Sequence, residues 1–308
     1  MKKTMYLMAT AITILAALIV VKCGDLSTNT DGNGKVDELI NQFNPKHTVR
    51  FFSDCGRDTA ITIAHNDPIP ANLLNTSPSA WSGFNFAGWF TDVTRKNKWE
   101  SADKVTSTIT LFSKWYFVDT RSPDTTNYPI VKIGNRIWMA ENLNFVDPTW
   151  SCDDCAAIEI GTRGSWCNNN NRSNCDTYGR LYTWEAAMVA CPAGWRLSNN
   201  DDWIDLMRAV AGGDSTEAGM ELKSKTGWKN PGNGKDDFGF SALPGGYRWP
   251  DNHFGSVSES GEWWSANYNQ QDPLKAYRWH MRYSHPEVHY NNNLGKNSGF
   301  SVRCVRNP

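Results

Sequence analysis

The sequence has almost no excess of charge of either sign. Its 308 residues hold 31 Lys and Arg against 32 Asp and Glu, so the formal net charge is −1 at pH 7. Nucleic acids and anionic membrane surfaces attract proteins that carry a basic patch or stripe. The charge balance gives no reason to expect either partner, and we predict no binding to nucleic acid. The chain is not expected to be disordered, because 40% of its residues are hydrophobic and 12% aromatic.

Complete ligand sets for a metal ion are also missing. The letters DGNGKVDE begin like a calcium-binding loop, but Lys35 and Gln42 stand where oxygen ligands at positions 5 and 12 belong. His280, His285 and His289 form the spacing H-x4-H-x3-H, but no carboxylate–histidine motif frames them. We therefore expect no metal site and no cofactor.

Tryptophan is the residue that the chain has in excess, with 15 copies. Trp fills cores, but its flat amphipathic ring also stacks on sugars and anchors interfaces. The count alone does not separate these uses.

The N-terminus has the layout of a secretory signal peptide. Lys2 and Lys3 precede an apolar run at residues 5–21, and Cys23 follows it. The run is nearly long enough to be an uncleaved membrane anchor, which is the alternative. The junction resembles that of bacterial lipoproteins, in which this cysteine is lipidated, although Lys22 departs from their pattern. We predict a signal peptide over residues 1–22, lipidation at Cys23, and a place in the cell envelope, at the outer membrane or on the cell surface.

Export determines how the cysteines are interpreted, because an oxidising compartment favours disulfides over redox thiols and metal ligands. Cys167 and Cys175 flank the polar tract NNNNRSN, which cannot bury itself, so a local disulfide there is expected. Cys152 and Cys155 form either their own disulfide or an exchanged pairing with those two. Cys55 has no obvious local partner.

The rest of the chain divides into four segments. A polar tether, 23–46, leads into a region with short β-branched and aromatic runs at Thr48–Phe52 and Thr108–Trp115, which predict strands. A linker is expected over 117–127, and the largest unit occupies 128–308.

The largest unit begins with a predicted hairpin at 130–140 that turns at Gly134-Asn135. Apolar residues at helical spacing predict a helix over 182–191, and a second helix that Ser198 caps and Gly212 ends. Beyond it we expect only short strands and long loops, until a last strand at 300–305.

Two resemblances add to these predictions. The letters GFNFAGWF, KWE and ITLFSKW, within residues 47–116, resemble the Listeria–Bacteroides repeat, also called the internalin B-repeat. That resemblance implies a small β-grasp-like module of surface proteins, used as a spacer or weak adhesive unit.

The letters VKIGNRIWMAENLN, YTWEAAMVACPAGWRL, NGKDDFGFSALPGGYR, EWWSA and GFSVRCV resemble the Fibrobacter succinogenes major paralogous (FISUMP) domain. More distantly, this part is similar to the C-type lectin-like fold, which also underlies formylglycine-generating enzymes. The resemblance implies an α+β class: a lectin-like domain of two helices, short strands and long disulfide-stapled loops. It also implies a disulfide between Cys191 and Cys304, worth about 4–5 kcal/mol in the chain-entropy model.

No catalytic constellation stands out, and we predict that the protein is not an enzyme. Formylglycine-generating enzymes need a reactive cysteine pair before the closing strand, and residues 276–302 contain no cysteine. A glycosidase needs two facing carboxylates. No such pair can be recognised among the acidic residues of this region, which are Asp236, Asp237, Glu259, Glu262 and Glu287. The Glu-Pro-Asn motif of calcium-dependent lectins is absent as well.

The remaining candidate is a binding surface in the loops before the last strand. Flat aromatic rings stand there beside amide, carboxylate and imidazole groups, a mixture that suits glycans or peptides. The residues are Arg248, Trp249, Asp251, Asn252, His253, Tyr268, Asn269, Trp279 and Tyr290. We predict a non-catalytic adhesion or binding module, with polysaccharide or a surface protein as partner. A purely structural envelope protein is the alternative, and an enzyme on the formylglycine-generating-type fold is less favoured.

Overall fold

The computed structural model describes residues 44–53, 58–78, 83–121, 125–151, 159–213 and 215–307. The chain divides into two units, Met1–Lys46 and His47–Pro308, and the described helices belong to the second. Across the described ranges, no helix combines the length and apolar character that a membrane span requires. Several predictions fall on residues outside these ranges: the apolar run at 5–21, Cys23, Cys55, Cys152 and Cys155.

An eight-stranded sheet extends from the first described strand to the last. Its order is β2-β1-β4-β5-β6-β15-β9, with β3 paired to β4. Strands β1 and β4 are parallel, whereas β3–β4, β4–β5 and β5–β6 are antiparallel. The strands are β1 Lys46–Phe52, β2 Thr59–Ala64, β3 Asn85–Phe90, β4 Ile109–Asp119, β5 Thr126–Ile133, β6 Arg136–Met139, β9 Arg196–Leu197 and β15 Cys304–Arg306.

The structure confirms the two strands expected within residues 48–115 and the hairpin, whereas the last strand, expected over 300–305, is limited to Cys304–Arg306. β1 covers the run at 48–52, β4 covers most of the run at 108–115, and β5–β6 turns at Gly134, whose φ is +58°. The segment 117–127 contains the end of β4 and the start of β5. These ends pair with each other, Val118 opposite Asn127.

A second sheet of five strands has the order β11-β10-β12-β13-β14. Its strands are β10 Gly245–Arg248, β11 Phe254–Val257, β12 Ser260–Tyr268, β13 Lys275–Arg282 and β14 His289–Gly295. A small third sheet pairs β7 Ser165–Trp166 with β8 Leu181–Tyr182. The long strands β12, β13 and β14 occupy a region in which the sequence predicted only short strands and loops. The alternation that signals a strand is lost in β12 because residues 260–265 are all buried, on both faces.

The helices are α3 Ala71–Asn75, the 3₁₀ helix η1 Asn168–Asn170, α4 Arg172–Tyr178, α5 Trp184–Ala190, α6 Asn200–Ala211 and α7 Ser215–Leu222. Helix α6 is capped by Asn199, one residue beyond the predicted Ser198, in a reciprocal capping box with Asp202, and Gly212 ends it in the left-handed conformation. Helix α5 buries its alanines, whereas Met188, one of the apolar residues at helical spacing in the predicted helix at 182–191, is exposed.

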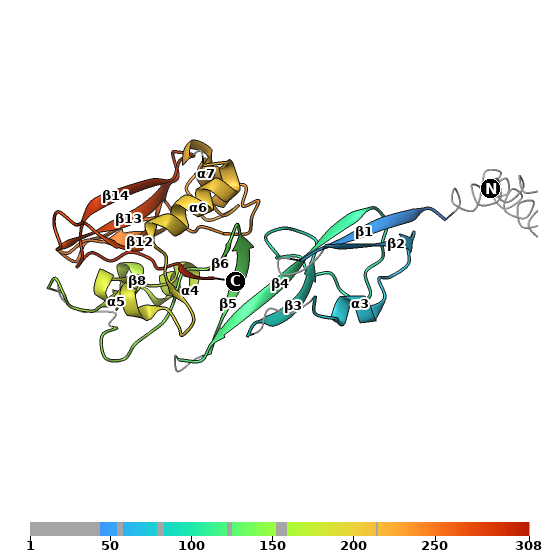
Figure 1. Cartoon of the computed structure of the whole chain (residues 1–308), viewed down its shortest axis with the longest axis horizontal. Coiled ribbons are helices and arrows are strands. Elements are labelled where there is room, and N and C mark those ends of the chain that lie inside the picture. Colours follow the sequence, from blue (N-terminus) through green and yellow to red (C-terminus); the bar gives the residue numbers. More distant parts are fainter. Residues whose placement is uncertain are drawn as a thin grey trace, which may run out of the picture. The chain divides into compact units, whose positions relative to one another are not determined.

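Helices cover both faces of the five-stranded sheet. Figure 1 shows α6 and α7 on one side of β12, β13 and β14, and α5 with β8 on the other. Each side has its own apolar cluster: Trp203 of α6 packs with Trp263 and Trp279, whereas the alanines of α5 pack with Trp264. Both faces of the sheet are therefore apolar where helices cover them.

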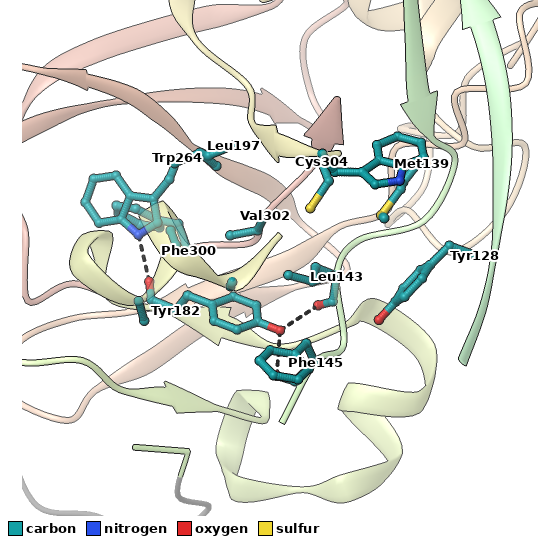
Figure 2. Packing of buried hydrophobic residues seen from close by; sticks show 14 of the residues in the cluster. Tyr128, Met139, Leu143, Phe145, Tyr182, Leu197, Trp264, Phe300, Val302 and Cys304 are labelled. Carbon is teal, nitrogen blue, oxygen red and sulfur yellow. Dashed lines mark hydrogen bonds between the residues drawn. The ribbon is translucent and has the colours of Figure 1, made fainter. Parts of the chain in front are cut away.

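Tyr182 lies fully buried in the second of these clusters (Figure 2). Its hydroxyl donates to the carbonyls of Leu143 and Phe145, at 3.2 and 2.9 Å, and its own carbonyl accepts from Nε1 of Trp264 at 2.7 Å. Burial raises the pKa of Tyr182 well above its usual value. The hydroxyl and the carbonyl of Tyr182 are therefore both hydrogen-bonded inside the core.

Two disulfides are present: Cys167–Cys175 and Cys191–Cys304. The first closes a short segment over α4, and Nη1 of Arg180 lies 3.6 and 3.7 Å from its two sulfurs. The second joins the end of α5 to β15 across 113 residues of sequence. It connects the last strand to the end of α5. Figure 2 shows Cys304 beside Met139 of β6.

The expected fold organisation is wrong in two respects, although the class remains mixed α and β. The structure has three sheets and five short α-helices among its described residues, rather than a two-helix lectin-like domain. The region of residues 47–116 is not a separate β-grasp module. Its strand β4 continues to Asp119 and pairs with β5, because the apolar run ITLFSKWYFV extends beyond the predicted end at Trp115. Strands from both regions therefore share one sheet.

Candidate functional site

The predicted ligand-binding residues lie in three places. Five are in or next to the turn between β10 and β11, Tyr268 and Asn269 are at the end of β12, and Trp279 and Tyr290 are paired across β13 and β14. The structure does not bring all nine together.

The β10–β11 turn holds a core residue and an exposed tip. Arg248 is fully buried, with its guanidinium carbon 3.9 Å from the ring centre of Trp166. It therefore offers no face to a ligand, which corrects the expectation from sequence. Trp249 is half-buried against Tyr247, whose ring centroid lies 4.7 Å away. The three exposed tip residues are Asp251, Asn252 and His253.

The end of β12 presents a separate aromatic residue. Tyr268 is 48% exposed, and the ammonium of Lys296 lies 5.2 Å from its ring centre and 3.9 Å from that of Trp184. Asn269 donates from Nδ2 to the carbonyl of Asn292 at 3.1 Å. This surface is distinct from the β10–β11 turn.

A groove of about 450 Å³ lies where β13 and β14 meet α6. Tyr290 is 61% exposed in it, whereas Trp279 is 3% exposed and forms its floor. The ring centroids of Trp279 and Tyr290 are 5.3 Å apart, and those of Tyr277 and Tyr290 are 6.1 Å apart. The groove is lined by Asn200, Ile204, Met207, Tyr277, Trp279, Val288, His289 and Tyr290.

The alternation of β13 places these rings on one face. Tyr277, Trp279 and Met281 are two residues apart and share a face, because successive side chains of a strand point to opposite sides. Trp279 is directly opposite Tyr290 of β14, so Tyr290 stands beside both aromatic residues of β13.

Two neighbours hold the floor of the groove in place. Trp203 stacks behind Trp279, with centroids 5.8 Å apart and planes 13° apart. Nε1 of Trp279 donates to Oδ1 of Asn200 at 3.0 Å, and the backbone N–H of Asn200 donates to Oδ1 of Asn267 at 2.8 Å. The Asn200 amide is thereby oriented, and its Nδ2 donor makes no hydrogen bond with the described residues.

Charged side chains of β12 and β13 lie on the opposite face of the sheet. Arg278 pairs with Glu262, which also accepts from the hydroxyl of Ser260 at 2.8 Å. Burial, with a smaller effect of Arg282, lowers the pKa of Arg278 to about 10. Burial together with the neighbouring guanidinium groups lowers the pKa of His280 to about 3, so its imidazole is neutral at pH 7. None of the residues lining the groove is Asp, Glu, Lys or Arg.

The histidine spacing of the sequence is only partly assembled. The rings of His280 and His289 are 5.5 Å apart across β13 and β14, whereas His285 contacts Ser284 in the connecting loop. Within the described ranges, no group of three or more His, Cys, Asp or Glu is arranged to hold a metal ion.

Sequence reasoning missed most of the groove lining. The missed residues are Asn200, Ile204, Met207, Tyr277, Val288 and His289. Tyr277 could have been found from its two-residue spacing to Trp279. The contribution of Met207 and the other α6 residues depends on long-range packing that no local pattern encodes.

A second hollow of about 580 Å³ lies in the N-terminal part of the unit. Phe51, Ile61, Leu73 and Trp89 are among its lining residues, and none of the predicted ligand residues is. The sequence therefore directs attention to the groove beside α6.

Comparison with known proteins identifies the family. A search of curated proteins and a search of solved structures returned no match. A family model described as the Fibrobacter succinogenes major domain (Fib_succ_major) matches residues 131–306. This match covers more than half of the chain, from β5 to β15, and includes the groove and both disulfides. The chain therefore belongs to the Fibrobacter succinogenes major domain family.

Proposed function

We propose that the protein is an exported, non-catalytic binding module that engages polysaccharide through the groove between α6 and strands β13 and β14. This groove, defined by its lining residues above, is called the α6 groove. It replaces the wider loop surface that the sequence suggested, because Arg248 is buried and the tip of the β10–β11 turn is a separate surface.

The observation that carries the proposal is the combination of fixed aromatic rings and uncommitted polar groups in one groove. Tyr290 and Tyr277 present ring faces or edges, and neither hydroxyl is hydrogen-bonded to the described residues. Nδ2 of Asn200 is an additional free donor at the rim. Sugar rings have apolar C–H faces and hydroxyl edges, so a binding site needs both kinds of group.

The proposed cellular location rests on the sequence alone. We propose that residues 1–22 are a signal peptide and that lipid on Cys23 tethers the protein to the cell envelope, at the outer membrane or cell surface. Metabolic labelling with a palmitate analogue tests this. Label should be present in the wild type and absent from Cys23→Ala. A mature wild-type chain that lacks the label would refute lipidation.

The relation of residues 47–116 to the internalin B-type repeat is likewise a proposal about sequence. It no longer includes a β-grasp organisation, since β4 is shared with the rest of the sheet. The role suggested for this region is to hold the C-terminal part away from the membrane.

A glycan array tests the binding function directly. Wild-type protein should bind a limited set of polysaccharides, and Tyr290→Ala should bind them at least about tenfold more weakly. Tyr268→Ala is the matched control, because it removes the same side chain at 48% exposure from a different surface. If the wild type binds no glycan, the structural envelope role becomes the better explanation.

A further inference from the structure

We infer that the α6 groove takes a single, uncharged glycan chain and not an acidic glycan or the face of an insoluble crystal. This inference rests on the proposed function and specifies its ligand. Two independent properties of the groove carry it, the charge of its lining and the relative orientation of its aromatic rings.

The lining has no partner for a charged sugar. Its eight residues include no acid, no lysine and no arginine. A uronate or sulfate buried there would lose hydration without gaining a cation, and this loss opposes binding. On β13, Arg278 and Arg282 are alternate residues that point to the opposite face of the sheet. Lys275 shares the face of Tyr277 but does not line the groove, and its ammonium pairs with Asp272 at 3.5 Å and donates to Oδ1 of Asn293 at 2.6 Å.

The polar groups available in the groove match neutral hydroxyls. A phenol hydroxyl both donates and accepts a hydrogen bond, and the Asn200 Nδ2 donates. Sugar hydroxyls also do both, so each of these groups can pair without any net charge on the ligand. The Oδ1 of Asn200 is already occupied by Nε1 of Trp279, which fixes the direction of the remaining donor.

The aromatic rings do not form a flat platform. The planes of Tyr277 and Tyr290 are inclined by 27°, and those of Trp279 and Tyr290 by 45°. A crystalline polysaccharide surface is planar and cannot contact all three inclined rings at once. A single chain can rotate from one sugar to the next, so that successive rings meet differently inclined faces.

The position of the rings leads to the same conclusion. Trp279 is 3% exposed and lies below the surface, between β14 and the Ile204 and Met207 side chains of α6. A flat solid cannot reach the floor of a groove, whereas one chain can enter it. Trp203 stacks behind Trp279, so the Trp279 ring cannot move outward to contact a flat surface.

Isothermal titration calorimetry on the full chain tests the inference with three kinds of probe. The soluble neutral probes are hexasaccharides of β-linked glucose, xylose and mannose. The acidic probe is a galacturonate hexasaccharide, and the solid probe, measured by depletion, is microcrystalline cellulose. At least one neutral hexasaccharide should bind, with little or no binding of the other two probes.

Variants connect that binding to the groove. Tyr290→Ala should weaken the binding of the neutral hexasaccharide at least about tenfold, and Tyr268→Ala should leave it unchanged. Tyr290→Phe keeps the ring but removes the hydroxyl, so it should lose less affinity than Tyr290→Ala. Circular dichroism checks that each variant is folded.

The outcomes separate the inference from the proposed function. Preferential binding of the acidic probe or the solid, lost in Tyr290→Ala, overturns the inference but keeps the polysaccharide function. Binding that Tyr290→Ala does not change shows that the site lies elsewhere and overturns both. No binding of any probe or of any glycan on the array also overturns both.

Discussion

Trp203 and Trp279 stack nearly parallel, with planes 13° apart, so that one indole supports the other beneath the α6 groove. Both are buried, at 0% and 3% exposure, and they connect helix α6 to strand β13. The floor of the candidate site is therefore part of the hydrophobic core. Changes at the floor and at the rim should have different effects.

Trp279→Ala should destabilise the protein strongly, by about 3–5 kcal/mol, because it leaves a cavity between α6 and the sheet. Tyr290→Ala should change the free energy of unfolding by no more than about 0.5–1 kcal/mol, since its side chain is 61% exposed. Urea denaturation measures both. Equal losses of stability would contradict the division into floor and rim.

Arg303→Met should also be strongly destabilising. Arg303 is fully buried and donates to the carbonyls of Met139, Phe240 and Ser241 and to Oδ1 of Asn142, at 2.6–3.0 Å. Its removal leaves several buried acceptors unpaired, and each costs about 1–3 kcal/mol. Burial lowers the pKa of Arg303 to about 9.

Arg306→Met is the control for this prediction, because Arg306 lies near the same end of the chain but is only half-buried. The expected result is a clear fall in the thermal midpoint for Arg303→Met and a small change for Arg306→Met. Similar midpoints for the two variants would show that the carbonyl contacts of Arg303 contribute little.

The two disulfides should differ in their contribution to stability. Cys191–Cys304 spans 113 residues and Cys167–Cys175 spans 8. In the chain-entropy model, loops of these lengths are worth about 4.8 and about 2.5 kcal/mol. The paired alanine variants should follow this order in denaturation without reductant, and free thiols at Cys191 and Cys304 in protein prepared without reductant would refute the pairing.

His280 should make the protein less stable in acid. Its folded pKa of about 3 lies below its ordinary value, so the unfolded chain takes up a proton at a higher pH than the folded one. Its contribution is fully present above about pH 6.5 and is lost as the pH falls toward about 3. The unfolding free energy of His280→Gln should therefore depend less on pH over this range.

Unfolding titrations at several values between pH 7 and pH 4 measure this slope. His253→Gln serves as the control, since His253 is exposed in the β10–β11 turn. The carboxylates titrate in the same range, so the informative quantity is the difference between each variant and the wild type. Identical slopes for His280→Gln and the wild type would contradict the prediction.

Local signals in the sequence were sufficient for part of the fold. The hairpin at Gly134-Asn135 and the end of α6 at Gly212 are encoded by turn and cap residues, and both are confirmed. Strand β12 could not be found in this way because both of its faces are buried, which removes the alternation of polar and apolar residues. The pairing of β4 with β5 was missed because the polar letters between them read as a linker.

The candidate site was predictable only in its aromatic residues. Trp279 and Tyr290 were identified because aromatic and polar residues occur together in this part of the sequence. Arg248 was grouped with them, although it is buried against Trp166. An arginine near a turn gives no sign in the sequence of which way it points. Asn200 joins the groove through contact between α6 and the sheet, at a distance of 79 residues along the chain from Trp279.

The pairing of β4 with β5 has a consequence for shortened forms of the protein. The matched family region begins at Val131, inside β5, and β4 ends at Asp119 before it. A fragment that starts at residue 128 would leave one side of β5 without its partner strand. It would also uncover Tyr128 and Ile130, which pack with Trp115 in the core. An open apolar edge of this kind recruits other chains, so such a fragment should self-associate, whereas one that starts at residue 47 should stay monodisperse.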